Sequence, residues 1–237
     1  MKNIEFFSMI DGVAESFPIK KIQEVLPKWV YNAKADYMKS EKKDMHLYKC
    51  PGIFDMFTTG YVVTNWLDIE IKTNDVGFSV TIPDPTIQEL LGKDIVQSQN
   101  HDGIAKFIPK RPWSVKSILK INTPWHVIVP KNVKLLMIPL PYPDTFEFES
   151  CIGMLDPSIS SEINIQGYWN VVNNSHILKA GTPLCHLIPI TEENLNLIVR
   201  DKNEKDNFWL KKRKYLNYFS FILNRQKVKE SYVGHFK

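Results

Sequence analysis

The 237-residue chain has few of the features that mark a secreted or membrane-bound protein. Its three cysteines, Cys50, Cys151 and Cys185, are an odd number without Cys-x-x-Cys spacing, which favours free thiols over a disulfide framework. No apolar run approaches the roughly 18 residues that cross a bilayer. Acidic residues stand near the N-terminus, where a signal peptide has an apolar stretch. We therefore expect no secretion signal, no membrane partner and a cytoplasmic location.

Sequence motifs of catalysis are also missing. The chain has no Gly-x-Ser-x-Gly elbow, no glycine-rich phosphate loop and no dinucleotide-binding fingerprint. Cys185 and His186 are neighbours in a strand-like segment, so their side chains point to opposite faces and do not form a nucleophile–base pair. Cys151 lies in an apolar segment, which favours a small core residue over a reactive thiolate. No catalytic residue is assigned, and the sequence favours a protein that is not an enzyme.

The strand pattern is strong. Six apolar, partly alternating segments follow one another between residues 113 and 190: SVKSILKIN, PWHVIVP, VKLLMIPLP, FEFESCIGML, SEINIQGYWNVV and TPLCHLIPI. Short strands at this spacing, with proline and glycine between them, are typical of a sandwich or barrel. The sequence predicts a mainly β protein with a jelly-roll or β-barrel-like core over residues 59–190.

Two flanking regions complete the predicted organisation. Residues 1–58 are predicted to wrap the core, with an opening strand at IEFF and short helical segments after it. Residues 191–237 are predicted to form a basic C-terminal helical tail that lies against the core. Thr191 followed by Glu193 is an acceptable helix start, and apolar residues recur further on at helical spacing.

The tail carries most of the positive charge. Residues 200–237 hold 11 lysine and arginine residues against four acids, a net +7, whereas the other 199 residues carry a net −3. The run KKRKYLNYF places basic residues beside aromatic rings, a combination that binds phosphate backbones and stacks on bases. Nucleic-acid binding is therefore one alternative function, and a solvated helix face or docking on another subunit are the competing interpretations. Its candidate residues are Lys211, Lys212, Arg213 and Lys214.

A metal site is the enzymatic alternative. His126 and His186 lie in two different predicted strands, and Asp156 lies between them in the chain. Two histidines and one carboxylate with open positions are the ligand set of non-haem iron oxygenases. The enzymatic alternative is therefore a cupin-like iron site of the 2-oxoglutarate type, with His126, His186 and either Asp156 or Glu162 as the expected ligands. The competing interpretation is that His126 and His186 are ordinary strand histidines, each with a ring nitrogen bonded to backbone or water.

Aromatic residues suggest a ligand site at one end of the core. Trp125, Tyr142, Tyr168 and Trp169 are candidates to line a pocket at a barrel mouth, although filling the core is the alternative role for them. The segment PLPYPDTF joins two predicted strands and is expected to expose Tyr142 and Phe146. Binding loops are commonly found at such a sandwich end.

Part of the chain resembles a known barrel. GMLDPSISSEINI followed by ILKAGTPLCHLIPI is similar in layout to the dUTPase-type β-barrel. Ile159 stands where that family has its nucleoside-stacking tyrosine, and Ser161 stands where it has glycine. The resemblance therefore implies a related layout without the catalytic motifs, and the activity does not carry over.

A second resemblance is broader. Five stretches spread over residues 17–190 resemble a family of uncharacterised proteins common in tailed phages of marine bacteria and in marine metagenomes: FPIKKIQEVLPKW, CPGIFDMFTTGYVV, NTPWHVIVPKNVKLLMIPLP, CIGMLDPS and ILKAGTPLCHLIPI. The resemblance implies a place in the host cytoplasm or the virion. Our leading hypothesis is a non-catalytic phage-type protein without a cofactor, which binds another protein, itself or a small ligand in a virion or host-takeover assembly.

Overall fold

The computed structural model describes residues 2–41, 46–74, 77–99, 104–109, 111–207 and 210. Strands account for 39% of the structure and helices for 22%, so the prediction of a mainly β protein is confirmed. The strands form three sheets, and none of the described sheets closes into a barrel. The finer jelly-roll or barrel description is not confirmed.

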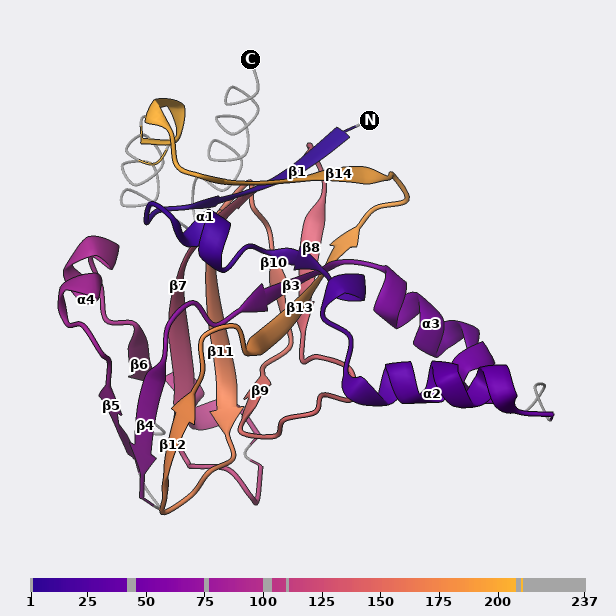
Figure 1. Cartoon of the computed structure of the whole chain (residues 1–237). Helices are drawn as coiled ribbons and strands as arrows, with labels where there is room; N and C mark the ends of the chain where they lie inside the picture. Colours follow the sequence, from indigo (N-terminus) through magenta and orange to yellow (C-terminus); the bar gives the residue numbers. More distant parts are fainter. Residues whose placement is uncertain are drawn as a thin grey trace.

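The largest sheet has six strands in the order β14–β1–β7–β11–β9, with β6 also paired to β7 (Figure 1). β1 and β14 run parallel, and the other neighbours are antiparallel. The strands are β1 (Lys2–Ser8), β6 (Val96–Gln99), β7 (Ile118–Ile128), β9 (Phe148–Ser150), β11 (Glu162–Trp169) and β14 (Leu195–Asp201).

The second sheet has the order β10–β8–β13–β3–β2, and a third, smaller sheet has the order β12–β4–β5. The strands of the second sheet are β2 (Lys20–Lys21), β3 (Tyr61–Thr64), β8 (Lys134–Ile138), β10 (Gly153–Leu155) and β13 (Pro183–Ile190). Those of the third are β4 (Ile69–Thr73), β5 (Phe78–Thr81) and β12 (Ser175–Leu178).

The two larger sheets share one hydrophobic core. Trp125 and Val127 of β7 point into it from the first sheet, and Cys185 and Leu187 of β13 point into it from the second. Because side chains alternate along a strand, the residues between these positions face away from the shared core. The two sheets therefore pack face to face as a sandwich.

Helices cover the outer face of the second sheet. A smaller core forms there from Ile22, Val30, Phe57, Val62 and Leu140. Helices α2 and α3 lie together beside this face and project beyond the strands (Figure 1). None of the described helices has both the length and the apolarity needed to cross a membrane. The α-helices are α1 (Val13–Ser16), α2 (Lys28–Lys39), α3 (Pro51–Thr58) and α4 (Thr86–Leu91), and the 3-10 helices are η1 (Ile22–Glu24), η3 (Leu47–Lys49) and η4 (Ile104–Phe107).

The strand boundaries differ from the prediction at two places. The two strands expected around Pro124 are one strand, β7, of 11 residues. The register between β7 and β11 shifts between Glu162 and Asn164, and a bulge of this kind accommodates a proline, which has no N–H to donate. The segment FEFESCIGML, expected as one strand, instead forms β9 in the first sheet and β10 in the second. The chain changes sheet at Cys151 and Ile152, which makes a corner of the sandwich.

The ends of the chain also differ from the prediction. The helix expected to begin at Thr191 is not present over residues 191–201. Leu195–Asp201 instead forms β14 beside β1. Leu195, Leu197 and Val199 pack against the shared core, and their spacing of two residues is the period of a strand. β1 lies between β14 and β7, so the N-terminal segment, predicted to wrap the core, contributes an inner strand of the first sheet. Residues 204–207, at the start of the tail helix predicted beyond β14, are helical. The rest of that helix, apart from Leu210, lies outside the described residues.

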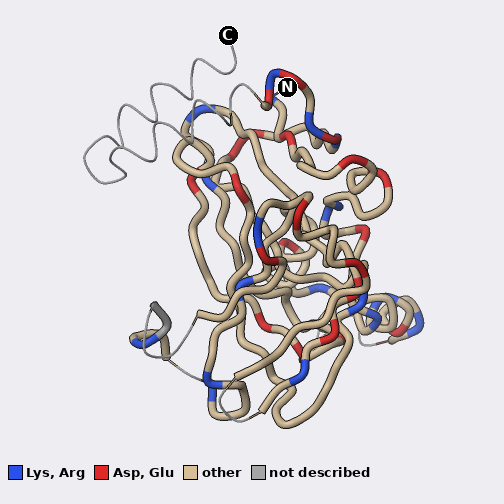
Figure 2. Tube along the Cα trace, turned by 90° about the vertical axis from the view of Figure 1, so that its left-hand side faces the viewer, with Lys and Arg blue, Asp and Glu red and all other residues tan. Residues whose placement is uncertain are grey.

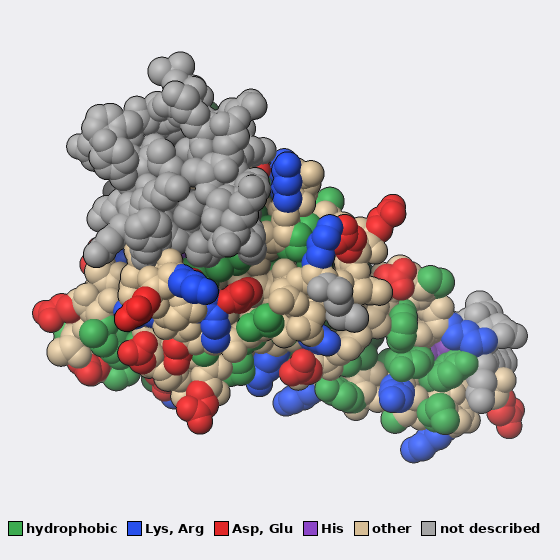
Figure 3. Space-filling view, turned by 90° about the horizontal axis from the view of Figure 1, so that it is seen from above, with side chains coloured by type: hydrophobic (Ala, Val, Ile, Leu, Met, Phe, Trp, Pro, Cys, Tyr) green, Lys and Arg blue, Asp and Glu red, His purple; other side chains and the backbone are tan. Residues whose placement is uncertain are grey.

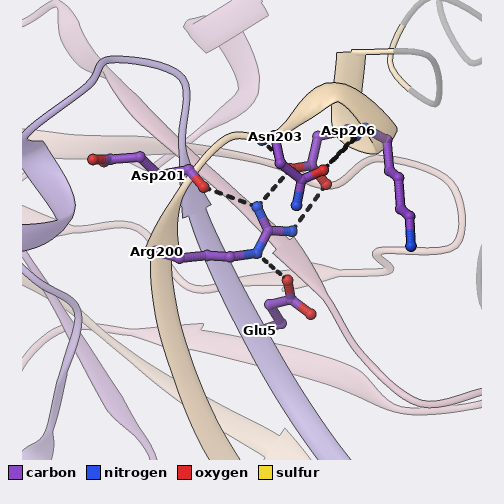
Figure 4. A network of polar contacts seen from close by, with 6 residues as sticks. Glu5, Arg200, Asp201, Asn203 and Asp206 are labelled. Atoms are coloured by element: carbon purple, nitrogen blue, oxygen red, sulfur yellow. Dashed lines mark hydrogen bonds and ion pairs between the residues drawn. The ribbon is translucent and has the colours of Figure 1, made fainter.

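An arginine fixes β14 to β1 and to the turn that follows it (Figure 4). The Arg200 guanidinium contacts the Glu5 carboxylate on β1, and its Nη1 and Nη2 atoms lie 2.5 and 3.0 Å from the two carboxylate oxygens of Asp206. Asp206 is 1% exposed and also accepts a hydrogen bond of 2.8 Å from the Asn203 N–H. The guanidinium lies over the Phe7 ring at 5.2 Å. This cluster of opposite charges holds the edge of the first sheet together.

The turn between α3 and β3 depends on Gly60. Its φ is 98°, and a Cβ atom there would lie 2.5 Å from the Leu187 carbonyl oxygen and 2.7 Å from His186 Nε2. The buried His186 ring lies against this turn, with Nε2 2.6 Å from the Thr59 carbonyl oxygen, and Nδ1 has no hydrogen-bond partner among the described residues. Burial lowers the pKa of His186, and the hydrogen bond to Thr59 opposes that shift. His186 Nε2–H therefore donates to the residue that follows the C-terminal end of α3.

Candidate functional site

A loop of residues 139–147 leaves the second sheet at the end of β8. Three prolines between positions 139 and 143 cannot donate ladder hydrogen bonds, so the chain departs from the sheet there. The loop reaches the N-terminus of α2 (Figure 1), where Asp144 accepts a hydrogen bond of 2.9 Å from the Lys28 N–H. Trp29 Nε1 donates to the Tyr142 carbonyl oxygen at 2.9 Å. These contacts hold the loop in place at one end of the sandwich.

The loop forms one wall of a cavity of about 200 Å³. Phe146 is 75% exposed, so its ring belongs to the rim of the cavity rather than to the core. An apolar cavity with an exposed aromatic ring on its rim is typical of a binding site. The apolar lining includes Pro139, Leu140, Phe146, Phe148 and Leu184, and the polar lining includes Thr145, Glu149 and Asn170.

A second cavity of about 630 Å³ adjoins the first, because Thr145 lines both. All four residues of β12 line it, together with Glu70, Glu147 and Lys179. β9 borders the first cavity and β12 the second, and each is the last strand on its side of its own sheet. We call the two cavities together the β9–β12 groove.

The groove has an excess of negative charge at one residue. Within and beside it, three acids face a permanent cation: Glu149 with Arg111 at 2.8 Å, Glu70 with Lys72 at 3.4 Å, and Asp68 with Lys179 at 2.8 Å. In the described part of the chain the one ionisable partner recorded for Glu147 is His176, whose Nε2 lies 3.6 Å from the carboxylate. Glu147 is therefore the acid that a basic group of a ligand would meet.

Hydrogen bonds keep the neighbouring acids ionised. The Ser175 hydroxyl, helped by the Lys72 ammonium, holds the pKa of Glu70 below its usual value. Hydrogen bonds from Lys179 and from the Ala180 N–H lower the pKa of Asp68 in the same way. Glu70, which lines the second cavity, and Asp68 beside it are therefore each a carboxylate paired with a lysine.

The predicted aromatic site does not assemble. Trp125 and Trp169 are fully buried in the shared core, which is the core-filling role that was their alternative. Tyr168 is 8% exposed and donates its hydroxyl hydrogen to the Pro109 carbonyl oxygen at 2.7 Å. Tyr142 is 64% exposed and packs edge-on against Trp29. The expected exposure of Tyr142 and Phe146 at a sandwich end is confirmed, whereas the four candidate residues do not line a common pocket.

The structure does not bring the predicted metal ligands together. His126 alternates with Trp125 and Val127, so it faces away from the shared core of the sandwich, stacks on Phe7 at 5.2 Å and lies 3.0 Å from the Ser161 hydroxyl. His186 faces away from the same core on the other sheet. The two histidines therefore lie on opposite outer faces of the sandwich.

The third candidate ligand is engaged locally. Asp156 accepts hydrogen bonds from the Ser158 N–H and hydroxyl in the turn before β11. Among the residues that the structure describes, no group of three histidine, cysteine or acidic side chains is arranged to hold a metal ion.

The basic residues proposed for nucleic-acid binding, 211–214, lie outside the described residues. Over the described body, acidic and basic positions are interspersed along the trace (Figure 2). Nucleic-acid binding therefore stays a prediction about the tail.

Sequence reasoning missed the groove residues Glu147, His176 and Ile177. The proline-rich segment PLPYPDTF was the signal that located this end of the sandwich. The β12 side of the groove had no signal, because its four residues become part of the site through the packing of the third sheet. In comparisons with known proteins, the chain matched no family model and no curated protein.

Proposed function

We propose that this protein is a non-catalytic binding protein, which holds a segment of a partner polypeptide in the β9–β12 groove. The observation that carries the proposal is the rim residue Phe146, which leaves most of its ring in solvent beside an apolar cavity. Burying an apolar side chain of a partner contributes roughly 1.5–3 kcal/mol, which favours occupation of such a cavity. The supporting contacts of the loop with α2 give the cavity a fixed shape before the partner arrives.

The setting that we propose follows the sequence resemblance. A phage-type protein of this kind would act in the host cytoplasm or in the virion, as part of a virion or a host-takeover assembly. We propose a jelly-roll-related topology for the core and no cofactor. The separation of His126 from His186 weighs against the iron-dependent alternative.

Nuclear magnetic resonance titration tests the proposal. The ¹⁵N-labelled full-length protein is titrated with a pool of random octapeptides, and amide shifts are mapped on the structure. We expect saturable shifts at Thr145, Phe146, His176 and Ile177. Shifts that map elsewhere, or no shifts at millimolar peptide, would contradict the proposal. So would turnover of a nucleotide, or of oxygen with 2-oxoglutarate, that His126→Ala abolishes.

A pair of matched variants sharpens the test. Phe146→Ser removes a ring that is 75% exposed, so the fold should keep its stability while peptide affinity falls about 10-fold or more. Phe107→Ser removes a ring that is 86% exposed and lies outside the groove, so it should change neither property. Equal affinities of the two variants for the peptide pool would remove the support that Phe146 gives to the proposal.

A further inference from the structure

Among the strands that the structure describes, β12 pairs with β4 on one side only, and its residues line the second cavity of the groove. The Thr73 N–H donates to the Asn174 carbonyl oxygen at 2.9 Å, so these two residues form a hydrogen-bonded pair just beyond the ends of β4 and β12. Hydrogen-bonded and non-hydrogen-bonded pairs alternate along an antiparallel ladder. The next hydrogen-bonded pairs are therefore His176 with Ile71 and Leu178 with Ile69. Ile177 therefore turns its N–H and carbonyl groups away from β4.

β12 is also the last strand of its sheet, and Ile177 lines the second cavity. Its side chain is 44% exposed. A strand edge with outward N–H and carbonyl groups is a template for an added strand, and many proteins bind extended peptides in this way. The shape of the site thus favours an extended backbone over a helix.

Side chains of the groove set the chemistry of the added strand. Glu147 holds the excess negative charge, and its recorded ionisable partner is an imidazole at 3.6 Å. A lysine or arginine of the partner would give Glu147 a permanent cation. The first cavity, with Phe146 and Phe148 in its walls, would take an apolar side chain of the same segment.

We infer that the partner segment is an extended, basic polypeptide that pairs with the backbone of Ile177, places a lysine or arginine beside Glu147 and inserts an apolar side chain into the first cavity. This inference rests on the proposed function, since it names the partner of that groove. The charge complementarity at Glu147 and the outward backbone of β12 are the two independent observations behind it.

Four defined peptides test the inference against the full-length protein. The first is acetyl-Ser-Val-Lys-Val-Ser-amide, and the second has glutamate in place of lysine. The other two keep the lysine and carry methyl groups on alternate backbone nitrogens, one peptide for each of the two alternating sets. We expect the lysine peptide to bind at least 10-fold more tightly than the glutamate peptide. At least one methylated set should lose 10-fold or more, and the lysine peptide should slow hydrogen exchange of the Ile177 amide.

Protein variants separate the charge from the strand pairing. Glu147→Gln should reduce binding of the lysine peptide about 10-fold, whereas Glu89→Gln, which neutralises an exposed acid on α4, should leave it unchanged. Binding of all peptides in the groove with equal affinity would overturn the inference and leave the proposed function standing. Absence of peptide binding in the groove would overturn the proposed function as well.

Discussion

Replacement of Arg200 by methionine should destabilise the fold by about 3 kcal/mol. Arg200 joins Glu5 on β1 to Asp206 after β14, and Asp206 is 1% exposed (Figure 4). Removing one partner of a buried ion pair costs about 3–5 kcal/mol, because the other charge stays buried without compensation. The Arg200 side chain is 25% exposed, so water can partly replace it, which places the expected cost at the lower end of this range. Methionine keeps an unbranched apolar stem over the Phe7 ring.

The charge contribution can be separated from the packing contribution. In the double variant Arg200→Met with Asp206→Asn, the buried carboxylate becomes a neutral amide that can still accept from the Asn203 N–H. We expect this double variant to be about 1 kcal/mol more stable than Arg200→Met alone, since the buried charge of Asp206 is gone and only the more exposed Glu5 carboxylate is left without its cation. Arg200→Lys keeps the charge and loses the two-pronged contact with Asp206, so its cost should lie between that of methionine and zero.

Thermal and urea unfolding monitored by circular dichroism measure these differences. For a domain of this size 1 kcal/mol corresponds to about 2–4 °C in Tm, so Arg200→Met should lower Tm by roughly 6–12 °C. A loss below about 1 kcal/mol would refute the reasoning, because it would mean that the Asp206 charge is well solvated without its partner. Strictly additive effects of the two substitutions would refute the coupling between Arg200 and Asp206.

Two further predictions concern the turn between α3 and β3. His186 has a lowered pKa in the folded state, so the unfolded chain binds more protons below about pH 6.5, and stability should fall as pH drops through that range. Urea midpoints at pH 7.5 and 5.5 should differ less in His186→Gln than in the unmodified protein, and an unchanged difference would exclude His186 as the source. Gly60→Ala should cost about 2–4 kcal/mol in thermal unfolding, because its Cβ would meet the Leu187 carbonyl oxygen at 2.5 Å with φ at 98°. Gly153→Ala, which meets nothing within 4 Å, should stay within about 0.5 kcal/mol, and equal losses in the two variants would contradict this account.

Local pattern was sufficient for elements whose neighbours along the chain determine them. Three further local patterns in the sequence predict a helix over TIQELLG, a hairpin around Asn74 and Gly77, and a helical turn that leads from CPGIF into a strand. The structure has all three elements. In each case the capping, turn or alternation signal lies within a few residues of the element that it specifies.

The errors lie where a distant strand decides the outcome. Leu195–Asp201 has an alternating pattern and follows a helix-like start, and the edge offered by β1, nearly 200 residues earlier, makes it a strand. Pro124 was expected to end a strand, and the bulge opposite Glu162 and Asn164 lets the strand continue. Neither partner can be identified from the local sequence.

The candidate site shows the same division. The sequence by itself determined the mainly β class, the alternation that turns every second residue into the core, and a proline-rich loop with Tyr142 and Phe146 exposed at one end. Tertiary structure alone decided that His126 and His186 face opposite sides of the sandwich, and that Glu147 meets His176 across the groove. The physical reason is that alternation fixes which face of its own strand a side chain occupies, whereas the pairing and packing of sheets decide which faces meet.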